Sequence, residues 1–255
     1  LNCMEHRGGC GGDSDSGDGA GILCSIPWGY LDEELNLINK QKLDRGLGMV
    51  FMPNKKEKIE ECKSICEEEA EKLSVKETSW RKVPVNNEIL GPLAKANVPY
   101  ICQWILYIDT KDNQNIERLL FQLRKRIEKK IRETFKNDVG DCEFYFASLS
   151  SQTVVYKGMV RSEILSEFYQ DLKKENFKVS FSVYHRRFST NTLPKWPLAQ
   201  PMRFLGHNGE INTLLGNINW AKASEIHIDN FWGELSSEIK PIVDINKSDS
   251  SNLDA

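Results

Sequence analysis

The amino-acid sequence predicts a layered α+β fold. Segments typical of strands alternate with helical segments in pairs rather than singly, which favours this class over a doubly wound parallel sheet. The 255 residues include 40% apolar residues and six tryptophans, enough for a sizeable core. No internal repeat and no low-complexity linker divides the chain.

The first half is expected to alternate helices with strands. Apolar residues at helical spacing among many Glu and Lys predict helices over residues 31–43 and 55–73, with a short strand at Met49–Pro53 between them. The β-branched and aromatic run Tyr100–Asp109 is typical of a buried strand. Apolar residues then step by three and four from Ile116 to Phe135, which predicts a long amphipathic helix with a basic, solvated face.

In the second half, two strands of the expected fold end in polar loops. Residues 142–160 predict two strands around a Ser-Ser-Gln turn, followed by a helix over 162–175. Residues 177–190 and 202–209 predict strands, the second passing into a helix over 210–225, and residues 240–245 predict a short strand that leads to Ser248-Asp249-Ser250.

Charge and cysteine content narrow the function classes. The formal net charge of −3 favours neither nucleic acid nor an anionic membrane as partner. No run of about 18 apolar residues and no secretory signal is found, which predicts a soluble, intracellular protein. Seven irregularly spaced cysteines favour reduced thiols. Cys62 and Cys66 share a helical face, where a small apolar pair is favoured over half a metal site, and no metal site is predicted.

The glycine- and aspartate-rich stretch His6–Gly21, "HRGGCGGDSDSGDGAG", raises three alternatives that each fit poorly. Its aspartates would repel a phosphate. As a calcium loop counted from Asp13, it has Asp18 where glycine belongs and Cys24 where Glu belongs. Cys10 between glycines is a poor platform for a reactive thiol. We interpret the stretch as a loop whose glycines take positive φ or permit close approach beside a site built from other residues.

Two later segments supply groups suited to acyl transfer. "YHRRFSTNT" offers adjacent arginines followed by hydroxyl and amide side chains, a set suited to gripping a carboxylate. "LGHNGEIN" offers an amide side chain beside a glycine N–H, the two donor types of an oxyanion hole. Each segment alone is a weak signal.

Together and in this order, the segments resemble one family closely. "MEHRGGCGGDSDSGDGAGIL", "SLSSQTVVYKGM", "YHRRFSTNTLPKWPLAQPMRFLGHNGEINTLLGNINW" and "SDSSNLD" resemble the glutaminase domain of the glutamate synthases, which are class II glutamine amidotransferases. The resemblance covers nearly the whole chain, is weakest over residues 31–100, and is greater to the ferredoxin-dependent branch than to the NADPH branch. Phe188 and "EINTLLGNINW" favour glutamate synthase over other class II amidotransferases. A non-catalytic domain of the same fold, serving regulation or assembly, stays a further alternative.

The resemblance implies a four-layer αββα sandwich of the N-terminal-nucleophile hydrolase type. In that family the nucleophile is an N-terminal cysteine, which lies some two to three dozen residues upstream of Arg7 and is absent from this chain. We therefore expect residues 1–255 to be a partial class II glutamine amidotransferase domain, truncated at both ends and inactive alone.

The resemblance also implies roles for individual residues. Asn208, through its side-chain amide, and Gly209, through its backbone N–H, match the oxyanion hole. Arg187 matches the clamp on the substrate α-carboxylate, with Thr190 and Asn191 beside it. Asp249 matches the acid that takes the α-ammonium.

One further residue supports the expected site, and two nearby histidines are assigned no catalytic role. Arg7 matches the family arginine that lies near the nucleophile and supports it. His185 and His207 are interpreted as structural, because the family uses its terminal amine as the base.

Partners and cofactors follow from the resemblance alone. The substrate is L-glutamine, and the released ammonia would pass to synthase domains of the same chain that use ferredoxin or an NADPH-oxidising subunit. No cofactor is expected in this domain, and FMN and an iron–sulfur cluster are expected in the synthase portion. The location implied is the bacterial cytoplasm or the plastid stroma.

Overall fold

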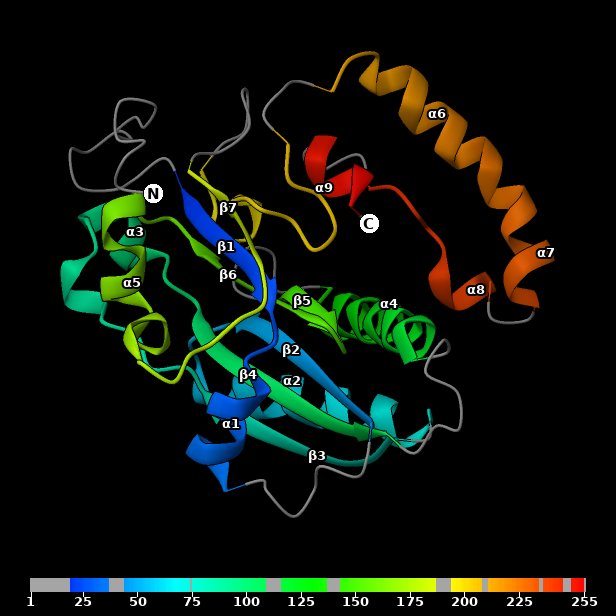
Figure 1. Ribbon diagram of the computed structural model, residues 1–255. Coiled ribbons are helices and arrows are strands. Elements are labelled where there is room, and N and C mark those ends of the chain that lie inside the picture. Colours follow the sequence, from blue (N-terminus) through cyan, green and yellow to red (C-terminus); the bar gives the residue numbers. More distant parts are fainter. Residues whose placement is uncertain are drawn as a thin grey trace.

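Two antiparallel sheets form the centre of the computed structural model (Figure 1). The structure describes residues 19–36, 44–73, 75–108, 116–136, 143–186, 194–207, 211–233, 236–244 and 249–254. Within these ranges the first sheet has the order β3-β4-β2-β5 and the second has the order β6-β1-β7. The strands are β1 (Ala20–Ser25), β2 (Asp44–Met52), β3 (Val75–Lys82), β4 (Tyr100–Ile108), β5 (Tyr145–Ser150), β6 (Thr153–Gly158) and β7 (Ser182–His185).

Helices follow the strands along the described chain. The α-helices are α1 (Trp28–Leu35), α2 (Lys56–Glu71), α3 (Pro92–Ala96), α4 (Ile116–Thr134), α5 (Leu165–Phe168), α6 (Leu214–Ser224), α7 (Ile228–Trp232), α8 (Ser236–Ile239) and α9 (Asp249–Leu253). The 3-10 helices are η3 (Asn87–Ile89), η5 (Ser162–Ile164), η6 (Gln170–Lys173), η7 (Trp196–Leu198) and η8 (Glu225–His227).

Strand β4 contributes side chains to two hydrophobic cores, one on each face of the first sheet. Its residues alternate between the two faces of the first sheet, so Ile105 and Tyr107 enter the core between the sheets. Trp104 and Leu106 enter a second core, which packs the other face of the sheet on α2 and α4. A strand buried on both faces is expected to be mostly apolar, and β4 is apolar or aromatic except at Gln103, which joins a buried polar network.

The chain segment around Gln200 comes very close to the outer face of the second sheet. Gly21 on β1 faces this segment, and a Cβ there would lie 2.5 Å from the carbonyl oxygen of Gln200 and 2.6 Å from Lys157 Cβ. Only glycine fits at this position. Gly19 has a φ of 78°, as the loop interpretation expects, and Gly21 permits the expected close approach, but Ala20 and Gly21 belong to strand β1 rather than to a loop.

A buried polar network crosses the core between the sheets. The carboxylate of Asp171 accepts hydrogen bonds from Tyr30 OH at 2.8 Å, Tyr156 OH at 3.1 Å, and both terminal nitrogens of Arg81 at 2.8 Å. Arg81 also donates to Gln103 Oε1 at 2.9 Å. Burial alone would lower the pKa of Arg81, but the hydrogen bonds and charge of Asp171 raise it above its usual value. The network joins α1, β3, β4, β6 and η6.

Helix α6 is the longest described helix without a buried residue. Leu215 and Trp220 are 76% and 73% exposed. Figure 1 shows α6 standing apart from both sheets, with α8 leading back to α4.

Several expected elements are confirmed. They are β4, α4, the β5 and β6 pair around its polar turn, β7 within residues 177–190, and the helices α2 and α6. Both cysteines of α2 are fully buried in the second core, and burial raises the pKa of the Cys66 thiol well above its usual value.

Other expectations were wrong in extent. The helix at 31–43 is α1, which ends at Leu35, and the strand at Met49–Pro53 is the longer β2. Its two glycines hid the strand; Gly46 lets Leu120 of α4 pack closely on β2, since a Cβ there would lie 3.0 Å from the end of the Leu120 side chain. The helix at 162–175 is broken into η5, α5 and η6, an arrangement that turns Asp171 into the buried network.

Two expected strands are absent from the described residues 202–207 and 240–244. In both, backbone N–H groups bond to side chains instead of a sheet ladder: Phe204 N donates to Asp254 Oδ1 at 2.7 Å, and Ile242 N to Glu225 Oε1 at 2.6 Å. Strands β1 and β3 were not predicted. β1 emerges from the glycine-rich loop, and β3 is a charged, partly exposed edge strand.

Candidate active site

Of the predicted site residues, Asp249 alone lies in the described part of the chain. Arg7, Arg187, Thr190, Asn191, Asn208 and Gly209 lie outside the described residues. Their roles remain predictions. The structure does describe the residues immediately beside several of them, and these fix the positions from which the site loops depart.

The segment before Asn208 meets the strand end before Arg187. Strand β7 pairs with β1, with Gly21 opposite His185. His185 Nε2 lies 2.7 Å from the backbone oxygen of His207. Since the oxygen can only accept, His185 donates. The end of β7 and the residues that lead up to His207, about twenty residues apart in the sequence, therefore lie side by side.

Helix α9 joins the same place from the end of the chain. Its Ser250 Oγ lies 2.8 Å from His207 Nε2 and accepts a hydrogen bond from Gln200 Nε2 at 3.2 Å. Asp249 Oδ1 accepts from the backbone N–H of Ser250 at 2.6 Å and from its hydroxyl at 3.2 Å. The predicted ammonium-binding acid thus stands beside the residue that precedes the predicted oxyanion hole.

The other end of α9 is tied to the same segment. Arg203 Nε lies 3.0 Å from Asp254 Oδ2, and Phe204 N donates to Asp254 Oδ1. The side chains of Arg203 and Asp254 are 5% and 0% exposed, so this is a buried ion pair. Both ends of α9 are therefore fixed to residues 200–207.

Lys157 anchors this segment to the second sheet. It is fully buried, and its Nζ donates to the carbonyl oxygen of Pro197 at 2.8 Å and to Tyr145 OH at 3.2 Å. Burial lowers the pKa of Lys157 to about 7; the nearby charge of Arg203 lowers it too, and Asp254 opposes this.

Arg186 is committed to an ion pair. Its Nη2 donates to Glu163 Oε1. Burial alone would raise the pKa of Glu163, but hydrogen bonds, including one from Ser162, and the charge of Arg186 lower it. Arg186 therefore fixes the end of β7 to Glu163.

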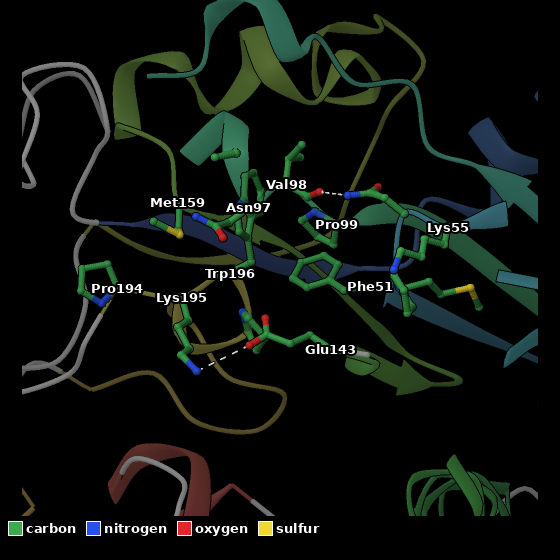
Figure 2. A pocket seen from close by; sticks show the side chains of 15 residues that line it. Phe51, Lys55, Asn97, Val98, Pro99, Glu143, Met159, Pro194, Lys195 and Trp196 are labelled. Carbon is green, nitrogen blue, oxygen red and sulfur yellow. Dashed lines mark hydrogen bonds and ion pairs between the residues drawn. The ribbon is translucent and has the colours of Figure 1, made fainter. Parts of the chain in front are cut away.

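A separate cavity of about 460 Å³ lies between the end of β2, the loop after α3 and Trp196 (Figure 2). Phe51, Met159 and Trp196 give it an apolar wall, and Lys195 pairs with Glu143 at 3.5 Å on its lining. Its described lining includes no cysteine, serine or histidine and does not include Asp249. We assign no reaction step to it.

The family model described as "Glutamine amidotransferases class-II" matches residues 1–255. The chain belongs to the class II glutamine amidotransferases. The two stacked antiparallel sheets with helices are the α+β sandwich of the N-terminal-nucleophile hydrolase fold expected for this family. The resemblance found in the sequence is confirmed.

Curated relatives of this class II amidotransferase share a further name. The chain is 47% identical over its whole length to "Ferredoxin-dependent glutamate synthase, chloroplastic" of Oryza sativa subsp. japonica and 47% to "Ferredoxin-dependent glutamate synthase 1, chloroplastic/mitochondrial" of Arabidopsis thaliana. It is 49% identical to "Ferredoxin-dependent glutamate synthase 2" of Synechocystis sp.. The chain spans 16% of the length of each. No described helix has the length and apolar character needed to cross a membrane.

Sequence reasoning missed the groups that hold the amidotransferase site together. Gln200, Ser250, Asp254 and Lys157 were not singled out. A signal existed for Lys157, since "TVVYKGM" places a lysine inside a buried strand pattern. Nothing local in the sequence shows that α9 packs against residues 200–207.

Proposed function

We propose that this chain is the glutamine-hydrolysing part of a longer, ferredoxin-dependent glutamate synthase, of which residues 1–255 are a portion of the amidotransferase domain. Family membership and identities of 47–49% to proteins with that name support the proposal. The observation that carries it is the meeting of three segments, the end of β7, residues 200–207 and α9, at His207 and Ser250. The predicted carboxylate clamp, oxyanion hole and ammonium acid depart from these segments.

The reaction is hydrolysis of the glutamine γ-carboxamide through a covalent intermediate. The thiolate of the N-terminal cysteine, which is outside these residues, attacks the carbonyl carbon and forms a tetrahedral oxyanion. Asn208 and the N–H of Gly209 stabilise that oxyanion. The C–N bond breaks as the nitrogen is protonated, ammonia leaves, and water hydrolyses the thioester to glutamate. Arg7 supports the nucleophile.

Substrate choice rests on the two charges of the amino acid. Arg187, with Thr190 and Asn191 beside it, binds the α-carboxylate, while Asp249 binds the α-ammonium. Asp249 is suited to this role because, among the described residues, the hydrogen bonds to its carboxylate fall on Oδ1. Its other oxygen, Oδ2, is the one we propose for the α-ammonium. Charge-assisted hydrogen bonds of this kind contribute roughly 1.5–3 kcal/mol each.

The synthase half-reaction and its cofactors belong to the longer protein. Iron–sulfur clusters are held by several cysteine thiolates. In the described ranges no three His, Cys, Asp or Glu side chains gather where they could hold a metal ion, and the four cysteines there are buried. These residues do not fit a cluster, and we place the cluster and FMN in the synthase portion. The plastid stroma or bacterial cytoplasm is the proposed location.

The full-length protein provides the test. Glutamine should be hydrolysed, and with 2-oxoglutarate and reduced ferredoxin each glutamine should yield two glutamates, whereas NADPH should not replace ferredoxin. Ammonia transfer to a different acceptor would identify another class II amidotransferase. Absence of any glutamine hydrolysis would identify a non-catalytic domain.

A further inference from the structure

A buried hydrogen-bond cluster at the start of α9 has no assigned role in the proposed reaction. It consists of Gln200, His207 and Ser250, which lie against Asp249. Gln200 and Ser250 are 1% and 0% exposed, and they bond to each other through Gln200 Nε2, whereas Gln200 Oε1 has no hydrogen-bond partner among the described residues. Ser250 Oγ is the centre, with Gln200 Nε2 at 3.2 Å, His207 Nε2 at 2.8 Å and Asp249 Oδ1 at 3.2 Å.

The contacts of Ser250 favour one arrangement of protons. Gln200 Nε2 also lies 3.4 Å from His207 Nε2, which is longer than its 3.2 Å contact to Ser250 Oγ, so we take both nitrogens to converge on that oxygen. A hydroxyl has one proton to donate and two lone pairs to accept with. Gln200 Nε2 can only donate, and a carboxylate oxygen can only accept. If the hydroxyl proton pointed at His207, Ser250 Oγ and Asp249 Oδ1 would be two acceptors facing each other. The proton therefore goes to Asp249, where the bond is charge-assisted, and His207 donates from Nε2.

This arrangement leads to a role for His207 and Ser250. We propose that they are positioning residues for Asp249: His207 and Gln200 donate to Ser250 Oγ, which commits the single hydroxyl proton of Ser250 to Asp249 Oδ1. With Oδ1 held by the hydroxyl and the backbone N–H of Ser250, Oδ2 is directed to the α-ammonium of the substrate. The inference rests on the proposed function.

The test compares two substrates in the full-length protein. Glutaramate has the amide and the carboxylate of glutamine but lacks the α-ammonium. Ser250→Ala should lower kcat/KM for glutamine about tenfold, mainly through KM, because a misaligned Asp249 loses much of one charge-assisted bond. The kcat/KM for glutaramate should change less than about twofold, since that substrate makes no ammonium contact. Glutaramate turnover also shows that the variant is folded.

Variants of His207 test the proton arrangement. His207→Ala should lower the glutamine-to-glutaramate ratio, and His207→Gln should restore it, because an amide nitrogen can also donate to Ser250. The double variant His207→Ala/Ser250→Ala should be no worse than Ser250→Ala alone, as expected for residues acting through one bond. Ser224→Ala removes a hydroxyl that bonds only within α6, to Trp220 O at 2.8 Å, and should change neither substrate.

The outcomes separate the two proposals. Equal losses for both substrates in Ser250→Ala, no loss for either, or additive losses in the double variant would overturn the positioning role and leave the proposed function intact. A wild-type protein that releases ammonia from neither amide would overturn the proposed function and the positioning role with it.

Discussion

Replacement of Asp171 by asparagine should destabilise the core between the two sheets more than any surface change. The Asp171 carboxylate accepts four hydrogen bonds within 3.1 Å, from Tyr30, Tyr156 and both terminal nitrogens of Arg81. Asparagine keeps one acceptor oxygen, loses the charge, and turns an N–H₂ donor toward other donors. Arg81, with 5% of its side chain exposed, would then lose its buried carboxylate partner and keep the longer contact from Nη2 to Glu34 Oε1 at 3.6 Å.

The magnitude follows from burial. Breaking a buried ion pair by removing one partner costs about 3–5 kcal/mol. The exposed pair Lys95–Glu88 offers a matched control, because its 2.9 Å separation is similar while its side chains are 47% and 82% exposed. Glu88→Gln should cost no more than about 1 kcal/mol.

Hydrogen exchange in the full-length protein measures both effects locally. Because about 1.4 kcal/mol is a factor of ten, amides of β3 and β4 should exchange roughly 10²- to 10³-fold faster or more in Asp171→Asn. In Glu88→Gln they should change less than about fivefold. If the two variants exchange alike at β3 and β4, the network does not stabilise the packed sheets and the reasoning is refuted.

Three other changes test the site and its support. Asn208→Ala should lower glutaminase kcat by about 10²–10³ while free ammonia is still used at the wild-type rate; equal loss of both activities would contradict the oxyanion role. Gly21→Ala should abolish glutamine hydrolysis, because its Cβ would lie 2.5 Å from Gln200 O, whereas Gly29→Ala, with no atom within 4 Å, should leave hydrolysis unchanged. Lys157 has a pKa of about 7 in the folded protein and about 10.4 in the unfolded chain, so between these pH values the unfolded state binds more protons. The free energy of unfolding of the wild type, measured in urea relative to Lys157→Met, should therefore rise from pH 7 to pH 10. A difference that stays constant with pH would contradict the lowered pKa.

Apolar periodicity predicted the long, strongly patterned elements correctly. The helix α4 and the strand β4 are long and strongly patterned, and the structure confirms them to within a residue or two. Residues 202–207 were predicted as a strand because of their short apolar run before a polar loop. Their backbone instead bonds to Asp254, about fifty residues away, which no local pattern could show.

The site was predicted in part for a different reason. Motif resemblance selected Asp249, but it could not show what orients the carboxylate. Gln200 and Ser250 are ordinary polar residues in the sequence, and their importance comes from being buried together. The sequence shows which residues are polar, whereas the fold shows which of these polar residues are buried from solvent.

The loops of the site need a rigid base, and the described residues supply one. Lys157 fixes residues 196–203 to β6, the Arg203–Asp254 pair fixes the far end of α9, and Ser250 fixes the near end. A reaction that needs a donor pair and a charged clamp in register tolerates errors of only about 0.5 Å, so loops mounted on independent supports would lose rate. Here the segments before residues 187 and 208 and the residue Asp249 share one support. Gly21 is part of this support, because a side chain at position 21 would push Gln200 away from the sheet. The described contribution of Gly21, the last residue of the glycine-rich stretch, is thus to let residues 200–207 approach strand β1 closely.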